Sequence, residues 1–272
     1  MPGTLSLKAY LAKLDDLLRA NALDEVVHHS RHILQYFPKN VATYRILGQA
    51  LLANGRWNEA GDLFRRVLSV YPDDSMAHMA LSDICQQGGR PKDALWHLER
   101  AYEQDPNNRV LIDALRDLYR QQRLEQTRVQ LTTAAVARQY THGGLYDQSV
   151  NTLRGALDRT PERIDLRLLL AEALWGNDQR IEAAEAALDV LDVLPDCRAA
   201  NRLLTEFWLD EERPSDAQRY LNRIEAIDPY LALELAQGKP PATRADLRID
   251  GASGDRVFLL NKGDGTVRLL VP

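Results

Sequence analysis

The chain has 272 residues, of which 45% are hydrophobic and 27% charged, and its 34 Lys and Arg against 39 Asp and Glu give a formal net charge of −5. So many apolar residues exclude an intrinsically disordered chain, and the length is sufficient for one large domain or two smaller ones. The mild acidity argues against binding to nucleic acid, which requires clustered basic side chains.

The sequence also predicts a cellular location. Cys85 and Cys197 are 112 positions apart, a spacing that does not indicate a disulfide framework and favours a reducing compartment. The first residues lack the basic start and apolar core of a signal peptide. No stretch approaches the roughly 18 uncharged apolar residues of a membrane span. We therefore expect a cytoplasmic protein that does not contact a membrane.

Along the chain, prolines recur with a fixed period. Each proline in two groups of three follows the previous one by 34 residues (72 − 38 = 34): Pro38, Pro72 and Pro106, then Pro161, Pro195 and Pro229. Such a period indicates a repeat architecture. With each proline at motif position 32, the repeats are 7–40, 41–74, 75–108, 130–163, 164–197 and 198–231.

Each repeat has the marks of a helical hairpin. Small residues recur at motif positions 8 and 20, for example Gly48 and Ala60, and they allow two helices to cross closely. Between these positions, turn residues such as Asn54 and Gly55 favour the left-handed conformation that closes a helix. The proline at position 32 ends the second helix. We therefore expect two helices in every repeat.

The best repeat spans 41–74 and contains, in order, Tyr44, Leu47, Gly48, Leu51, Gly55, Trp57, Ala60, Phe64, Val67 and Pro72. These residues resemble the tetratricopeptide repeat, a helix-turn-helix unit of the same length. The resemblance covers residues 7–231 and implies an all-α, right-handed solenoid of helical hairpins. The first repeat departs most, with Lys13 and Leu14 where an apolar and a small residue are usual, as is typical of a terminal repeat.

Residues 109–129 interrupt the period. Their first half resembles a first helix, with Ile112, Leu115 and Tyr119 at motif positions 4, 7 and 11, but no complete second helix follows. The segment after Leu124 lacks Gly and Pro, so we predict one long helix over 125–141. The solenoid would then contain 13 helices, and the odd helix would reverse the direction of later first helices. This predicts two lobes, 7–121 and 122–238, with a kink or rotation between them.

The C-terminal tail, 239–272, has a different pattern. Residues 247–250, 256–260 and 266–271 resemble short β-strands with a turn at 261–265. An isolated hairpin is marginally stable in water. The tail therefore packs on the last repeat, pairs with a strand of a partner, or remains mobile. Pairing with the tail of a second copy would make the protein a homo-oligomer.

Motifs that carry chemistry are scarce. His28 and His32 are one helical turn apart, next to His29, but the His-Glu-x-x-His pattern is absent, which favours a solvated helix face over a metal site. No glycine-rich loop follows a strand, and the sequence has neither a Gly-x-Ser-x-Gly motif nor a Cys/His pair. We predict a protein with no catalytic residues, bound metal or cofactors.

The remaining candidate site is a surface. The resemblance implies that first helices bind ligands at motif positions 2, 5, 9 and 12. The carboxylate clamp of this family is not reproduced, because position 9 holds no Asn. In the first lobe these positions instead combine apolar residues with carboxylates, which suits a basic, amphipathic segment. The candidate partner-binding residues are Asp15, Arg45, Gln49, Leu52, Met76, Met79, Asp83, Asp113, Asp117, Arg138, Glu172 and Trp175.

The function that we predict is a non-catalytic protein–protein interaction scaffold that binds a peptide or helical segment on its inner face. One alternative is a helical-repeat protein that binds nucleic acid, although such repeats typically have a period of 35 and this chain is acidic. Another is a metal-binding protein that uses His28, His29 and His32. The partner itself cannot be identified from the residues.

Overall fold

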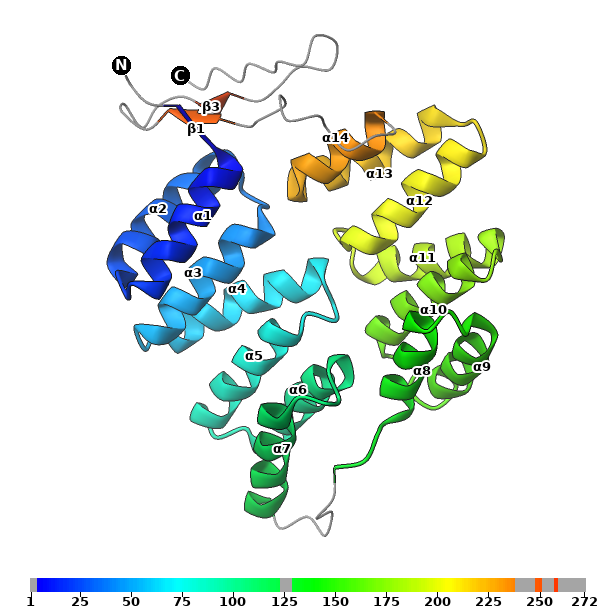
Figure 1. Ribbon diagram of the computed structural model, residues 1–272, viewed down its shortest axis with the longest axis horizontal. Helices are drawn as coiled ribbons and strands as arrows, with labels where there is room; N and C mark the ends of the chain where they lie inside the picture. Colours follow the sequence, from blue (N-terminus) through cyan, green and yellow to red (C-terminus); the bar gives the residue numbers. More distant parts are fainter. Residues whose placement is uncertain (1–3, 123–128, 238–247, 251–256, 259–272) are drawn as a thin grey trace. The chain divides into compact units, whose positions relative to one another are not determined.

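The computed structural model describes residues 4–122, 129–237, 248–250 and 257–258. Within these ranges the chain forms 14 helices and three short strands (Figure 1). The helices are α1 Leu7–Arg19, α2 Leu23–Tyr36, α3 Val41–Ala53, α4 Trp57–Val70, α5 Ser75–Gln87, α6 Pro91–Gln104, α7 Arg109–Gln121, α8 Thr133–His142, α9 Tyr146–Leu157, α10 Ile164–Gly176, α11 Arg180–Val193, α12 Arg198–Asp210, α13 Pro214–Ile227 and α14 Pro229–Gln237. The strands are β1 Thr4–Ser6, β2 Arg248–Asp250 and β3 Val257–Phe258.

The chain divides into two compact units. The first unit combines Met1–Leu63 with Ile224–Pro272, and the second consists of Phe64–Arg223. Both ends of the chain therefore belong to the first unit. The division into lobes at 7–121 and 122–238 remains a prediction.

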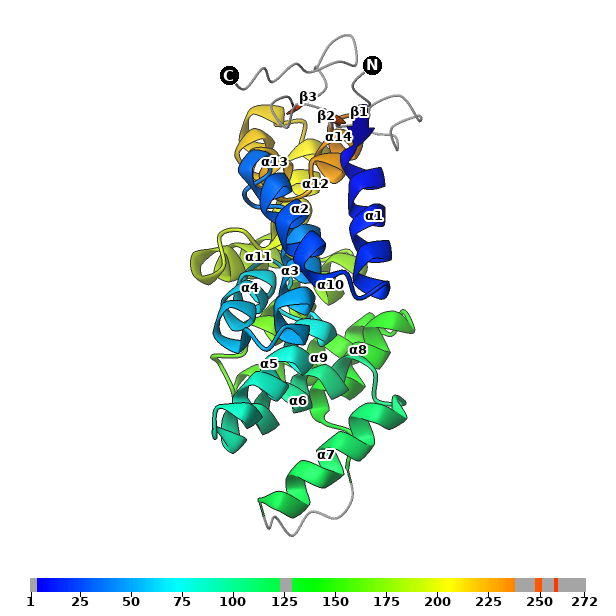
Figure 2. The same cartoon turned by 90° about the vertical axis from the view of Figure 1, so that its left-hand side faces the viewer.

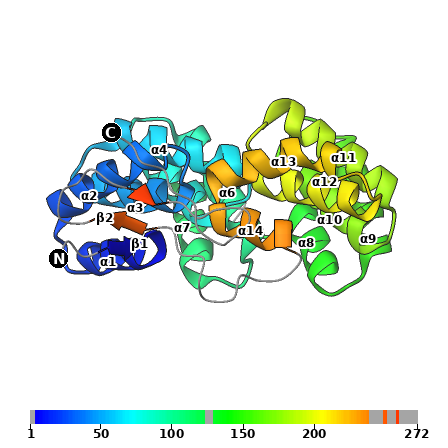
Figure 3. The ribbon, with the colours of Figure 1, turned by 90° about the horizontal axis from the view of Figure 1, so that it is seen from above.

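The expected helix pairs are confirmed. Helices α1–α6 and α8–α13 occupy the six predicted repeats two by two. In Figure 3 the second helices α9 and α11 lie along one side of α8, α10 and α12. The small residues meet as expected, because the Ser82 hydroxyl donates to the carbonyl of Ala94 at 2.8 Å. In the α8/α9 hairpin, the Ser149 hydroxyl donates to the carbonyl of Ala137 at 2.9 Å.

All six hairpin turns contain a residue with positive φ at motif position 15. Three are the glycines Gly55, Gly89 and Gly144, with φ between 67° and 71°. The other three are Asn21, Asp178 and Glu212, with φ of 57°, 59° and 54°. Glycine and Asn adopt this left-handed conformation at low cost, whereas Glu does not. Glu212 therefore occupies a position whose backbone favours glycine.

A second recurring contact links consecutive repeats through the proline at position 32. The side chain six residues later donates a hydrogen bond to the proline carbonyl. The Arg167 guanidinium bonds to Pro161 at 2.9 Å, and the Asn201 amide bonds to Pro195 at 3.0 Å. Tyr44 and His78 make the same contact with Pro38 and Pro72. After Pro106 the corresponding residue is Ile112, which has no side-chain donor, so the contact is missing where the period breaks.

The odd helix is present as α7, a single helix between two hairpins in the second unit (Figure 2). The prediction of a continuous helix over 125–141 was wrong. Residues 129–132 are not helical and α8 begins at Thr133, while 123–128 lie outside the described residues. The reason is a cap: the Thr132 hydroxyl accepts the N–H of Ala135 at 3.2 Å, which fixes the helix start.

The ends of the chain meet in a small antiparallel sheet of order β1-β2-β3. Residues 4–6 pair with 250–248, and 248–249 pair with 258–257. Close by, the N–H of Lys8 donates to the Tyr230 hydroxyl at 3.3 Å. The tail strand β2 therefore pairs with the start of its own chain, an arrangement that the sequence did not predict. The expected strand at 266–271 lies outside the described residues.

Two apolar clusters form much of the interior of the second unit. One is centred on α6 and α7 and includes Leu98, Leu111 and Leu115. The other is built from α8–α12 and is rich in alanine and leucine, for example Ala171 and Leu204. These clusters lie on either side of the break in the repeat period.

The unusual backbone at Glu212 gives a testable prediction. Glu212→Gly should stabilise the protein by about 0.5–1 kcal/mol, because glycine adopts positive φ without steric cost. The neighbouring Glu211, with φ of −78°, is the matched control, and Glu211→Gly should destabilise by a similar amount. Both free energies of unfolding can be measured by chemical denaturation. Equal destabilisation by the two substitutions would contradict the strain at Glu212.

Candidate functional site

Five of the predicted partner-binding residues lie on α5 and α7, two first helices that both pack against α6. Met76 is 49% exposed, and Asp83, Asp113 and Asp117 are also exposed. Met79 is half-buried and packs against the apolar cluster beneath it. Four of the five are therefore accessible to a ligand.

An exposed valine adds to this group. Val110, at motif position 2 of α7, is 68% exposed although it is apolar. We call Met76, Asp83, Val110, Asp113 and Asp117 the α5/α7 surface. It combines accessible apolar side chains with carboxylates on successive first helices.

The carboxylates of the α5/α7 surface differ in their surroundings. Asp113 pairs with Arg116 at 2.9 Å and Asp117 with Arg120 at 3.0 Å, in each case within one helical turn. Exposed pairs of this kind contribute about 0–1 kcal/mol, so a ligand can replace the arginine at little cost. Partial burial of its carboxyl group raises the pKa of Asp83.

Three candidate residues on α8 and α10 make contacts with other residues of the fold. Arg138 is buried and its Nη1 pairs with Asp73 at 3.2 Å. Burial raises the pKa of Glu172, and the charge of Asp73 adds to the effect. The Trp175 ring lies under the guanidinium of Arg180, with 3.9 Å between the guanidinium carbon and the ring centroid. These contacts leave less of each side chain available to a partner than motif position alone indicates.

The remaining candidates belong to the first unit. Asp15 lies on α1, and Arg45, Gln49 and Leu52 lie on α3. All four side chains are half-buried. The predicted residues are therefore distributed over several helices, and the most exposed of them lie on α5 and α7.

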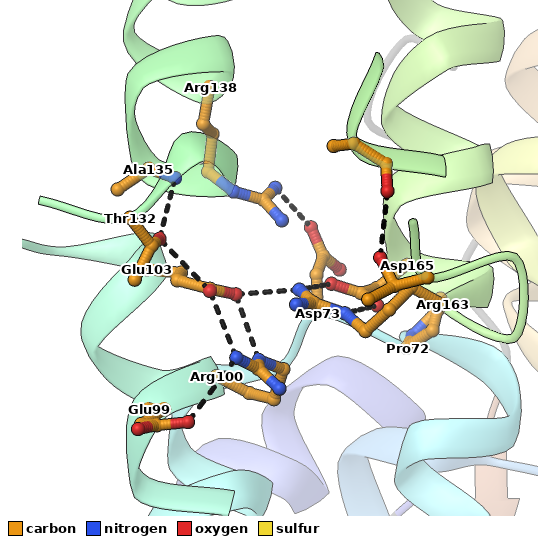
Figure 4. A network of polar contacts seen from close by, with 12 residues as sticks. Pro72, Asp73, Glu99, Arg100, Glu103, Thr132, Ala135, Arg138, Arg163 and Asp165 are labelled. Atoms are coloured by element: carbon orange, nitrogen blue, oxygen red, sulfur yellow. Dashed lines mark hydrogen bonds and ion pairs between the residues drawn. The ribbon is translucent and has the colours of Figure 1, made fainter. Parts of the chain in front are cut away.

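A buried cluster of charged side chains in the second unit was missed by sequence reasoning (Figure 4). Its centre is Glu103, which is only 2% exposed. Arg100 binds both oxygens of this carboxylate at 2.9 and 3.0 Å. Arg163 donates to Glu103 at 2.6 Å, and the Thr132 hydroxyl donates at 3.0 Å. The cluster joins α6 to the starts of α8 and α10.

A second carboxylate completes the cluster. Arg163 also binds both oxygens of Asp165, at 2.8 and 2.6 Å. Burial alone would raise the pKa of Asp165, but the hydrogen bonds and charge of Arg163 outweigh it and lower the pKa. The same pairing, together with Glu103, raises the pKa of Arg163 against the effect of burial. Both groups therefore stay charged inside the fold.

The sequence did hold one signal of this cluster. Motif position 34 carries a helix-capping residue in the first three repeats, namely Asn40, Asp74 and Asn108, but Arg163 in the fourth. Arginine does not cap a helix N-terminus. Its presence there indicates that another contact determines the residue at this position.

The histidines of α2 do not converge on one point. The Nδ1 of His29 is 2.7 Å from the Tyr10 hydroxyl. The rings of His28 and His29 are 5.6 Å apart at nearly right angles. Across the part of the chain that the structure describes, no group of three or more His, Cys, Asp or Glu is arranged to hold a metal ion.

A second histidine pair lies between α5 and α6, where His78 is buried and His97 is half-buried. The His78 Nε2 lies 3.1 Å from the Pro72 carbonyl, so this nitrogen carries the hydrogen and Nδ1 accepts. The His97 Nδ1, at 3.0 Å from the His78 Nδ1, must then donate. Both rings are neutral in this arrangement. Burial lowers the pKa of both residues, and for His97 to about 4.

Residues 12–69 and 46–109 match the family model described as tetratricopeptide repeat. These overlapping matches fall on the 34-residue helix pairs of α1–α6. Residues 12–109 therefore consist of tetratricopeptide repeats. Proteins with such repeats are generally non-catalytic scaffolds for protein–protein interaction.

Solved structures resemble this tetratricopeptide repeat protein at low identity. A tetratricopeptide repeat protein from Parabacteroides merdae ATCC 43184 is 14% identical, and the match covers 85% of this chain and 97% of that one with a TM-score of 0.41. MamA AMB-1 is 19% identical, with 68% and 96% covered and a TM-score of 0.32. The P58(IPK) TPR domain is 13% identical, with 85% and 66% covered and a TM-score of 0.38. A search of curated proteins finds no match.

Among the described residues, none of the helices combines the length and apolar character that crossing a membrane requires.

The buried cluster around Glu103 gives a stability prediction. Glu103→Ala leaves Arg100 and Arg163 without this partner inside the fold, which should lower the free energy of unfolding by about 3–5 kcal/mol. Asp16→Ala is the control, because Asp16 pairs with Arg19 at 3.0 Å in an exposed position and should lose less than about 1 kcal/mol. Chemical denaturation measures both. Similar losses for the two variants would show that the buried cluster is not important for stability.

The pair of His78 and His97 gives a pH prediction. Because folding lowers the pKa of His97 from its ordinary value of 6.5 to about 4, the unfolded chain binds more protons in this range. The stabilisation is complete above pH 6.5 and is lost as the pH falls towards 4. The melting temperature should therefore fall between pH 7 and pH 5.

The substitution His97→Gln separates this effect from other titrations. Its amide still donates to His78 but does not titrate, so the fall in melting temperature should be smaller than in the unmodified protein. An equal fall in both proteins would assign the pH dependence to other groups.

Proposed function

We propose that this tetratricopeptide repeat protein binds a peptide or helical segment of a partner protein on its inner face, and that the α5/α7 surface makes the main contact. The observation that supports this proposal is the exposure of apolar side chains among carboxylates. Met76 and Val110 are 49% and 68% exposed. Asp83 lies on the same helix as Met76, and Asp113 and Asp117 lie on the same helix as Val110, all at motif positions that face a ligand in this family.

Apolar contact would supply much of the affinity. Removing apolar surface from water contributes about 25 cal/mol per Å², and both Met76 and Val110 have surface left to bury. The methionine side chain is flexible and unbranched, so it adapts to partners of different shape. The surface therefore suits an amphipathic segment more than a rigid, purely polar one.

The carboxylates determine which segments fit. Asp113 and Asp117 are held by weak, exposed ion pairs with arginines of their own helix. A basic residue of the partner can take the place of either arginine. Acidic residues of a partner would instead meet three carboxylates. We therefore expect a basic, partly apolar segment.

A peptide selection tests the proposal. Random peptides displayed on phage and selected on the immobilised full chain should be enriched in Lys or Arg together with apolar residues. The variant Asp83→Lys, Asp113→Lys, Asp117→Lys should weaken binding of a selected peptide by about tenfold or more, measured by calorimetry.

The matched control reverses three other exposed carboxylates with the same change in net charge, as Asp158→Lys, Glu162→Lys, Asp210→Lys. Binding should survive in this control. Enrichment of acidic peptides, or an equal loss in both variants, would refute the proposed site.

A further inference from the structure

The outer face of α11 differs from the outer faces of the other second helices. In the other five second helices, motif positions 18 and 25 are polar: Asp24 and Arg31, Asn58 and Arg65, Lys92 and Glu99, Asp147 and Arg154, Ser215 and Asn222. Nine of these ten side chains are exposed, and Glu99 is half-buried. In α11 these two positions hold Ile181 and Leu188. The other second helices thus show that the outer helix face of this repeat is normally polar.

These two apolar side chains are accessible. Ile181 is 70% exposed and Leu188 is 42% exposed, and Val193 at the end of the helix is 55% exposed. Residues seven apart lie on the same side of a helix, about 10 Å apart along its axis. The opposite side of α11 is buried through Ala183, Ala187 and Val190. Packing of the repeats therefore does not explain Ile181 and Leu188.

Carboxylates alternate with them along the same side. Glu185 lies between Ile181 and Leu188, and Asp192 follows Leu188 by one turn. Both are exposed, and neither has an ion-pair partner among the described residues. Glu182 and Asp189, which flank this side, pair with Arg154 and Arg167 of other helices. The result is an alternation of apolar and unneutralised acidic residues.

We propose that this side of α11, formed by Ile181, Glu185, Leu188 and Asp192, is a second docking surface that binds a basic amphipathic helix of a partner protein. Its apolar residues would contact Ile181 and Leu188, and its Lys or Arg residues would pair with Glu185 and Asp192. A second copy of α11 is excluded by charge, because its own carboxylates would face these two. This surface is separate from the inner face and adds to the function proposed above.

A defined peptide pair tests the charge requirement. The probe is a fluorescently labelled helical peptide of about 18 residues, long enough to hold some helix in solution, with leucines on one side and lysines on the other. The comparison peptide has glutamate in place of lysine. The lysine peptide should bind the full chain, more weakly at high salt, and should protect amides of 180–193 from hydrogen exchange. Equal binding of both peptides would overturn the proposal.

Substitutions then locate the contact. Ile181→Ser, Leu188→Ser should change the melting temperature little, because neither side chain is part of the core. It should weaken binding of the lysine peptide by about tenfold. The control Ser215→Ala, Asn222→Ser changes the same motif positions of α13 and should bind normally. Unchanged affinity of the α11 variant, or protection confined to other helices, would refute the surface.

The inner-face proposal is tested separately. In the variant Asp83→Lys, Asp113→Lys, Asp117→Lys, protection of 180–193 should persist, because α11 is unaltered. Loss of that protection would mean that the lysine peptide binds at the α5/α7 surface and that α11 is not a docking site.

Discussion

The buried carboxylate of Glu103 holds the second unit together where its repeat period breaks. A regular array of hairpins joins each pair to the next through apolar contacts, but here α7 has no second helix and much of the apolar interior is in two clusters. Glu103 accepts hydrogen bonds from α6 itself, from the start of α8 and from the start of α10. A buried ion pair is a weak source of net stability compared with apolar packing. Its directional hydrogen bonds instead fix one arrangement of the three helices.

Two smaller contacts explain why the intact repeats need no such cluster. A residue of positive φ closes each hairpin at the same motif position, and a side-chain donor reaches the carbonyl of the preceding proline at four junctions. Both depend on residues close in sequence. At the break, Ile112 stands where the other repeats have a side-chain donor. The hydrogen bond between Glu103 and Arg163, which are 60 positions apart, joins the helices there instead.

Whether a contact joins residues that are near or far apart in the sequence decides whether it could be predicted. The helix pairs, their turns and the odd helix follow from proline, glycine and small residues that act locally, and all were predicted. The start of α8 was not, because Thr132 combines a cap with a tertiary bond to Glu103. Burial of Arg138 against Asp73 was missed for the same reason. Strand β1 has three residues and depends on a partner from the other end of the chain, so no local pattern indicates it.

That pairing of the chain ends changes how the array loses structure. In a linear solenoid the terminal repeats have one neighbour instead of two, and they fray independently of each other. Here the first helix and the C-terminal segment share one compact unit, with β1 paired to β2 and Lys8 bonded to Tyr230. Opening at one end therefore removes contacts from the other. We therefore expect the two terminal segments to unfold together, and local unfolding of this protein to start elsewhere than in an ordinary open-ended array.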